Sequence, residues 1–217
     1  MARDRQYSQS EEKANALSHA LGIVLGIAAG FLLLNAASTN SWAVLSVWVY
    51  LFGMMASYIT STWYHGTTNP ERKRILQKLD HASIYLHIAG SYTPFTLVTL
   101  RNEGWWGWGI FLFVWIAAIV GVALSFRRHD KHSHLETACY VIMGCSILIA
   151  LNPLLDALSV DGKTSAFYYL VGGGVSYVVG ALFYSWRKVK YMHTVFHFFV
   201  LGGSICHILA IFTVVSQ

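Results

Sequence analysis

Only 12% of the 217 residues are charged, whereas 55% are hydrophobic, and soluble domains usually carry about 25% charged residues. The mean hydropathy is +0.49, and the charges are bunched into short clusters between long apolar runs. This pattern excludes a disordered or fibrous chain and argues against nucleic-acid binding as the reason for the basic pI. It indicates a protein that crosses a membrane several times.

Seven apolar stretches are each long enough to cross about 30 Å of hydrocarbon as a helix. None shows the alternation of a membrane β-barrel. We therefore predict an all-α bundle of seven transmembrane helices that forms one domain over residues 1–217, with residues 1–16 as a cytosolic tail. The stretches are Leu17–Ala37, Trp42–Tyr64, Leu79–Leu100, Trp105–Phe126, Leu135–Leu155, Ser165–Trp186 and Tyr191–Val215.

Two short patterns in the first part of the chain predict local contacts. Ser8 and Glu11 have the spacing of a capping box, which would start a short helix ahead of the first span; chance in a polar tail is an equal alternative. Gly22, Gly26 and Gly30 recur every four residues in the first span. This repeat predicts a close contact with a neighbouring helix.

The distribution of Lys and Arg predicts the orientation of the bundle. Thirteen of the fifteen lie in the N-terminal tail and in the loops after the second, fourth and sixth spans, and the other two are Arg101 and Lys163. Positively charged loops stay on the cytoplasmic side. We therefore expect a cytoplasmic N-terminus and an external C-terminus.

Polar residues inside spans are costly and are candidates for function. Ser61 and His65 share a helical face at the end of the second span, Asp80 lies at the start of the third, and His193 and His197 lie at the start of the seventh. The predicted directions of these spans place His65, Asp80, His193 and His197 at one depth near the inner interface. Three imidazoles and a carboxylate are thus expected to meet there.

Three imidazoles with an open fourth position are typical of a catalytic zinc site. Such a site activates water for attack on a carbonyl. Asp80 would then orient that water or act as a general base, and Ser61 would orient a ligand or an oxyanion. Taken one at a time, these residues have ordinary structural explanations, and imidazoles also bind other divalent metals; the shared depth is what favours a metal.

The other histidines predict less. His19 and His207 are possible polar contacts of the same site, and His87 lies on roughly the same face of its span as Asp80. The run His129, His132 and His134 is more readily explained as a solvated basic loop than as a metal site.

Several stretches together resemble the bacterial hemolysin III proteins, which belong with the progestin and adipoQ receptors and, more distantly, the alkaline ceramidases. They are residues 61–65, 79–86, 89–95 and 193–207. The resemblance implies a seven-helix bundle in the bacterial cytoplasmic (inner) membrane, with zinc held near the inner leaflet by His65, His193 and His197. It also implies that Asp80 holds the metal-bound water and that Ser61 supports Asp80.

Two functions compete at this point. One is a zinc-dependent hydrolase of a lipid amide or ester, which would influence membrane lipid homeostasis with membrane lipid as its substrate. The other is a non-enzymatic membrane sensor or regulator of fluidity or energetics, in which zinc has a structural role. A transporter and a cytolytic pore are less favoured, because no repeat indicates the former and no part of the sequence suggests the soluble form that a pore-forming toxin usually has.

Overall fold

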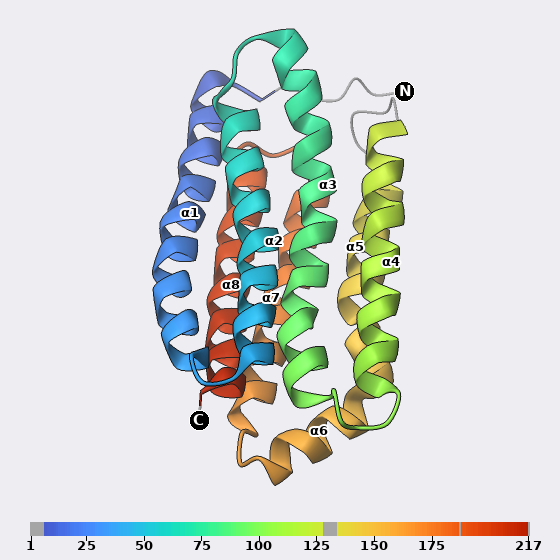
Figure 1. Ribbon diagram of the computed structural model, residues 1–217. Helices are drawn as coiled ribbons and strands as arrows, with labels where there is room; N and C mark the ends of the chain where they lie inside the picture. The colour runs from blue at the N-terminus through green and yellow to red at the C-terminus, as the bar shows by residue number, and fades with distance from the viewer. Residues whose placement is uncertain (1–6, 128–133, 187, 217) are drawn as a thin grey trace.

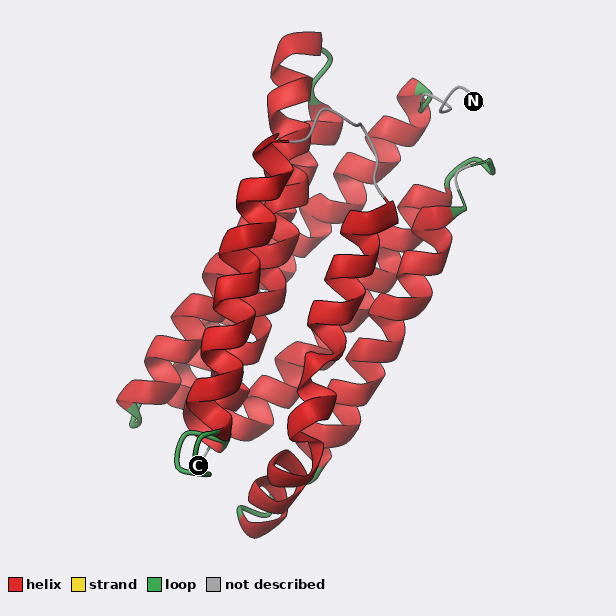
Figure 2. Cartoon of the chain, turned by 90° about the vertical axis from the view of Figure 1, so that its right-hand side faces the viewer, coloured by secondary structure: helices red, strands yellow, loops and turns green. Residues whose placement is uncertain are grey.

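The computed structural model describes residues 7–127, 134–186 and 188–216, except for the side chain of residue 134. All secondary structure in this part of the chain is helical, as Figure 2 shows. The predicted all-α class is therefore confirmed. The elements are α1 (Gln9–Ala37), α2 (Ser41–Gly66), α3 (Pro70–Pro94), η1 (Phe95–Thr99), α4 (Trp106–Arg127), α5 (His134–Cys145), η2 (Ser146–Ala150), α6 (Leu151–Val160), α7 (Ser165–Ser185) and α8 (Met192–Val215).

The long helices follow one another around a ring and run the length of the molecule (Figure 1). Each of α1 to α4 packs on the next, α5 contacts α3, α4 and α7, and α8 closes the ring between α7 and α1. Helices that meet in this way bring residues far apart in the sequence to the same level. The start of α1, the end of α2 and the starts of α3 and α8 lie at one end, at the top of Figure 1.

Within the described residues, six helical segments are long and apolar enough to cross a membrane: α1, α2, α4, the continuous stretch Leu135–Val160, α7 and α8. The stretch Leu135–Val160 comprises α5 and α6, which are joined by the 3₁₀ turn η2. Of the seven predicted spans, the third is missing from this set. It runs from Leu79 in α3 through η1, and the mean hydropathy of α3 is lowered by charges in its first turns and by buried polar side chains further along, among them Ser83, His87 and Thr93.

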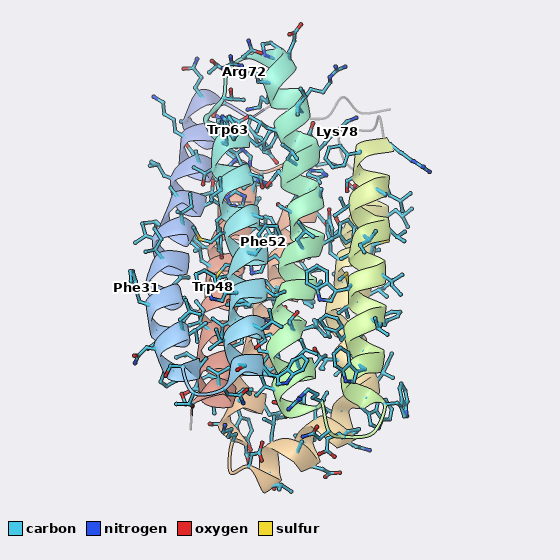
Figure 3. The ribbon with its side chains drawn as sticks, viewed as in Figure 1. Phe31, Trp48, Phe52, Trp63, Arg72 and Lys78 are labelled. Carbon is cyan, nitrogen blue, oxygen red and sulfur yellow. The ribbon has the colours of Figure 1, made fainter. Side chains whose placement is uncertain are left out.

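The outer surface is apolar, as expected of a protein surrounded by lipid. Phe31, Trp48, Phe52 and Trp63 are more than half exposed and project outward from α1 and α2, whereas Arg72 lies at the end of the bundle (Figure 3). A water-soluble protein rarely leaves such a continuous apolar surface uncovered.

Both short patterns near the N-terminus are confirmed. The Ser8 backbone N–H donates to Glu11 Oε2 over 3.0 Å and the Glu11 N–H donates to Ser8 Oγ over 3.3 Å, so α1 begins with a complete capping box. The helix is continuous from Gln9, eight residues before the predicted span. Side chains at Gly22 and Gly26 would collide with Tyr58 and Met55. Those two glycines therefore bring α1 close to α2.

Candidate metal centre

His65 occupies the last turn of α2 and is 3% exposed. The helix ends one residue later at Gly66, and Asn69 caps α3 by accepting hydrogen bonds from the backbone N–H groups of Glu71 and Arg72. The short connection makes α3 return beside α2. Asp80 of α3 is thereby placed next to Ser61 and His65 of α2, at the same end of the bundle.

The start of α8 is fixed by a strained residue. Tyr191, immediately before the helix, has a left-handed backbone with φ 63°, which costs a residue with a side chain about 1 kcal/mol or more. Its N–H donates to Glu11 Oε1 over 3.0 Å, and Glu11 is 1% exposed. The capping carboxylate of α1 therefore also holds the turn that leads into His193 and His197.

The three predicted imidazole ligands meet. His65, His193 and His197 offer ring nitrogens that all lie within 4.8 Å of one another, and Nε2 of His65 is 3.1 Å from Nε2 of His193. Nitrogen ligands lie about 2.0 to 2.1 Å from zinc, so two that share a tetrahedral ion are about 3.4 Å apart. The cluster could hold a metal ion.

The hydrogen-bond partners of His197 and His65 favour the tautomer in which Nε2 is unprotonated and can bind a metal. The Nδ1 atom of His197 is 3.2 Å from the carbonyl oxygen of Asn15, and a carbonyl only accepts, so Nδ1 carries the proton and Nε2 keeps its lone pair. Nδ1 of His65 is 2.6 Å from Glu12 Oε2, which has the same effect. Ligating histidines commonly have such carbonyl or carboxylate partners.

The hydrogen bonds to α1 tie the cluster to three helices. Ser18 Oγ lies 2.9 Å from Nδ1 of His197, and Thr194 donates to Asn15. Glu12 is also 2.8 Å from Nζ of Lys73, at the start of α3. The imidazoles of α2 and α8 are therefore oriented by the first three turns of α1 and by the α2–α3 connection.

Asp80 and Ser61 lie beside the imidazoles. The Asp80 carboxylate, 9% exposed, interacts with Ser61 through a side-chain hydrogen bond and electrostatically with His65. On the other side, Nδ1 of His81 is 3.0 Å from Glu136 Oε2 of α5. Asp80 is thus a buried carboxylate that interacts with the ring cluster through His65 and with the His81–Glu136 pair through His81.

A cavity of about 490 Å³ runs from this centre into the bundle. Asp80, His193 and His197 line one end, and its walls continue along α3, α5, α7 and α8 with mostly apolar side chains such as Ile88, Leu148 and Leu170. Ligand cavities are of this size and are usually apolar with a few placed polar groups. The volume and lining suit a chain-like apolar molecule with a polar end.

Comparison with known proteins identifies the relatives of this chain. Residues 7–208 match the family model described as "Haemolysin-III related". The chain belongs to this family. It is 39% identical over 196 residues to "Hemolysin-3" of Bacillus cereus, covering 89% of this chain and 87% of that protein. A similar match, 38% identity over 200 residues, is found with "Hemolysin-3 homolog" of Bacillus subtilis, covering 91% of each chain.

The relationship extends beyond bacteria. The human "Monocyte to macrophage differentiation factor" is 31% identical over 209 residues, covering 93% of this chain and 83% of that protein. The resemblance to hemolysin III and its wider group of receptors, predicted from short motifs, is therefore confirmed over most of the chain. This protein is a multi-pass membrane protein of the haemolysin-III related family.

The remaining described histidines lie at different distances from the cluster. The His19 ring stacks on that of His197 with centroids 3.4 Å apart, so it joins the centre as a neighbour. His87 and His207 line the cavity further from the cluster. His129 and His132, and the side chain of His134, lie outside the described residues.

Sequence reasoning missed Glu12. In the sequence it is one of three acidic residues of a polar tail, but its carboxylate is the partner of His65. A signal was available: Glu12 lies seven residues before His19 and three before Asn15, which places the three on one helical face. Recognising it required α1 to begin before the apolar span.

Proposed function

We propose that this protein is a zinc-dependent hydrolase of a lipid amide or ester in the bacterial cytoplasmic membrane, and that it influences membrane lipid composition. The observation that carries the proposal is the position of three imidazoles at the polar end of a mostly apolar cavity, with Asp80 and Ser61 in the same wall. A lipid could place its head-group linkage at the imidazoles and its acyl chain along α3, α5 and α7.

His65, His193 and His197 would hold the ion, and a set of three imidazoles favours zinc. Bound zinc would supply Lewis acidity, which activates water and polarises a carbonyl. Asp80 would accept a proton from the attacking water and return it to the leaving amine or alcohol as the C–N or C–O bond breaks. Ser61 orients the Asp80 carboxylate, and the apolar walls exclude other water.

We also propose seven spans with a cytoplasmic N-terminus. In support, α3 and η1 together run from Pro70 to Thr99 and pack between α2 and α4, so buried polar side chains along α3 face protein rather than lipid. The test is labelling by a membrane-impermeant thiol reagent, after replacement of the three native cysteines. A cysteine at Asn102 should react in intact cells, and one at Lys188 only after permeabilisation; the reverse pattern would overturn the orientation.

The hydrolase is tested with purified protein. Wild type should contain about one zinc per chain and should cleave members of a panel of acyl amides and esters. Asp80→Asn should keep the metal and lose turnover, with Glu71→Gln as the control for loss of an acidic residue away from the centre. Cells that lack the protein should accumulate the substrate lipid. Metal-loaded wild type that cleaves nothing in a broad panel would count against the enzyme.

A second function is favoured by a specific observation. The imidazoles join α2 to α8, and Glu12, Asn15 and Ser18 join both to α1, so an ion there would also fix three helices together. The alternative is a non-enzymatic membrane sensor or a regulator of fluidity or energetics with structural zinc. Full cellular function in an Asp80→Asn strain, combined with its loss in a His193→Ala strain, would favour this alternative.

A further inference from the structure

The cavity has a second polar region in its middle, formed by His87 of α3 and His207 of α8. Both side chains line the cavity and are 7% and 8% exposed. Nε2 of His87 and both ring nitrogens of His207 have no hydrogen-bond partner among the described residues. A buried polar group without a partner is costly, and native proteins contain few of them.

The neighbouring side chains of Tyr58 and Tyr177 do not meet this need, because their hydroxyls bond to Ser204. The Tyr58 and Tyr177 hydroxyls lie 2.8 Å and 3.1 Å from Ser204 Oγ. The Tyr177 ring lies between the histidines, with centroids 6.4 Å from His87 and 5.1 Å from His207. These two tyrosines therefore surround the region, and the atoms left without a partner in the described part of the chain are Nε2 of His87, both ring nitrogens of His207 and the hydroxyl of Tyr50, whose ring lies 6.4 Å from that of His87.

Glycines make room for these rings. A side chain at Gly173 of α7 would collide with the His207 ring, and one at Gly203 would lie 2.6 Å from the Tyr177 ring. The rings thus occupy space that α7 and α8 provide only through residues without a Cβ. A histidine that only borders a gap between helices would not need such space.

The distance from the metal centre follows from the helices. His207 is ten residues beyond His197 on α8, and His87 is seven beyond Asp80 on α3. At 1.5 Å per residue, the two polar regions are roughly 10 to 15 Å apart along the cavity. Apolar side chains such as Ile84 and Val200 line the same cavity. A matching ligand has a polar end, an apolar segment and a second polar group partway along its chain.

We propose that His87 and His207 form a subsite for a hydroxyl group on the acyl chain of the lipid. A neutral imidazole has one donor and one acceptor, and a hydroxyl also both donates and accepts. An unsubstituted chain would leave the imidazoles unpaired, so the site discriminates against it. The inference rests on the proposed function only in that a lipid chain occupies the cavity; it does not require turnover.

The test is displacement of a fluorescent fatty acid from the purified, metal-loaded protein. The competitors are stearic acid and a positional series of its monohydroxy derivatives. We expect a mid-chain hydroxyl to improve competition about tenfold over stearic acid, and hydroxyls near the carboxylate to give no gain. The readout is the ratio of affinities, which a general loss of stability leaves unchanged.

The variants are His87→Leu and His207→Phe, with Phe167→Leu as a control that changes an apolar cavity residue. The first two should abolish the preference for the mid-chain hydroxyl and keep the zinc, and the control should keep both. If His207→Phe does not fold beside Gly173, His87→Leu alone must reduce the ratio. Equal affinities for all competitors in wild type would overturn the subsite, because the imidazoles would then form hydrogen bonds only with water. Failure of every fatty acid to compete would instead remove the lipid-binding cavity on which the proposed function depends.

Discussion

The helices that carry the imidazole ligands, α2 and α8, are buried more completely than α7 and the stretch Leu135–Val160, which also line the cavity. Half of the most apolar stretch is buried in α2 and in α8, against 17% in α7 and 22% in Leu135–Val160. The first pair is fixed to α1 by hydrogen bonds at the metal centre and, for α2, by close glycine contacts. Metal ligands need fixed geometry, whereas the lipid of the proposed function would have to enter and leave. Sparse packing gives segments lower local stability, and α5 and α6 have it, because they make few contacts with the other helices.

The largest expected effect is the loss of the metal when His197 of the well-buried helix α8 is replaced. His197→Ala leaves two imidazoles and an open cavity end, so we expect the zinc content of the purified protein to fall from about one per chain to near zero. Metal analysis of the detergent-purified variant provides the measurement. His87→Leu, which changes a histidine of the cavity, should keep its metal. Unchanged zinc content and affinity in His197→Ala would show that the ion binds elsewhere.

The packing difference itself can be tested with two identical substitutions. Gly22→Ala pushes a methyl group into the Tyr58 ring, whereas a side chain at Gly174 of α7 meets nothing within 4 Å. We expect Gly22→Ala to destabilise the protein by about 1 to 3 kcal/mol. Gly174→Ala should stabilise it by about 0.5 to 1 kcal/mol, because alanine is the better helix former. Thermal unfolding in detergent compares them, and equal shifts would show that the two sides are packed alike.

Most of the fold, and the meeting of the three imidazoles, could be predicted from the sequence. Long apolar runs specify membrane helices almost without reference to tertiary structure. The directions of successive helices then place His65, His193 and His197 at one depth. The glycine repeat likewise predicted the contact of α1 with its neighbour. These features depend on periodicity and alternation, which a single sequence shows directly.

Features that depend on contacts across the bundle could not be predicted. The partnership of Glu12 with His65 requires α1 to extend beyond its apolar span and to lie beside the end of α2. The left-handed Tyr191 has no local signal, because neither glycine nor asparagine occupies the position. The hydropathy of α3 reflects polar side chains that face protein, so composition alone does not distinguish a shielded span from a soluble helix.

Glu12 of α1 orients the proposed metal ligand His65 of α2 through a hydrogen bond. Glu12→Gln removes the charge that favours the Nδ1-protonated ring of His65 and the ion pair with Lys73. Loss of such a partner typically weakens metal binding roughly 10- to 100-fold. Competition with a chelator of known affinity measures the change, and Glu71→Gln, on the exposed first turn of α3, should bind zinc as wild type does. An unchanged affinity would mean that His65 is oriented by helix packing alone.

The smallest effect is expected at Ser18, because His197 keeps a second partner there. Ser18 Oγ and the Asn15 carbonyl both lie within hydrogen-bond distance of Nδ1 of His197. Ser18→Ala removes one of them, and the carbonyl still requires the proton to stay on Nδ1. The loss should therefore be that of one ordinary hydrogen bond, about 1 kcal/mol or roughly fivefold in zinc affinity, measured by the same competition. An effect as large as that of Glu12→Gln would mean that the hydroxyl, rather than the backbone of α1, sets the tautomer, and that the support of this ligand depends on a side chain that one substitution removes.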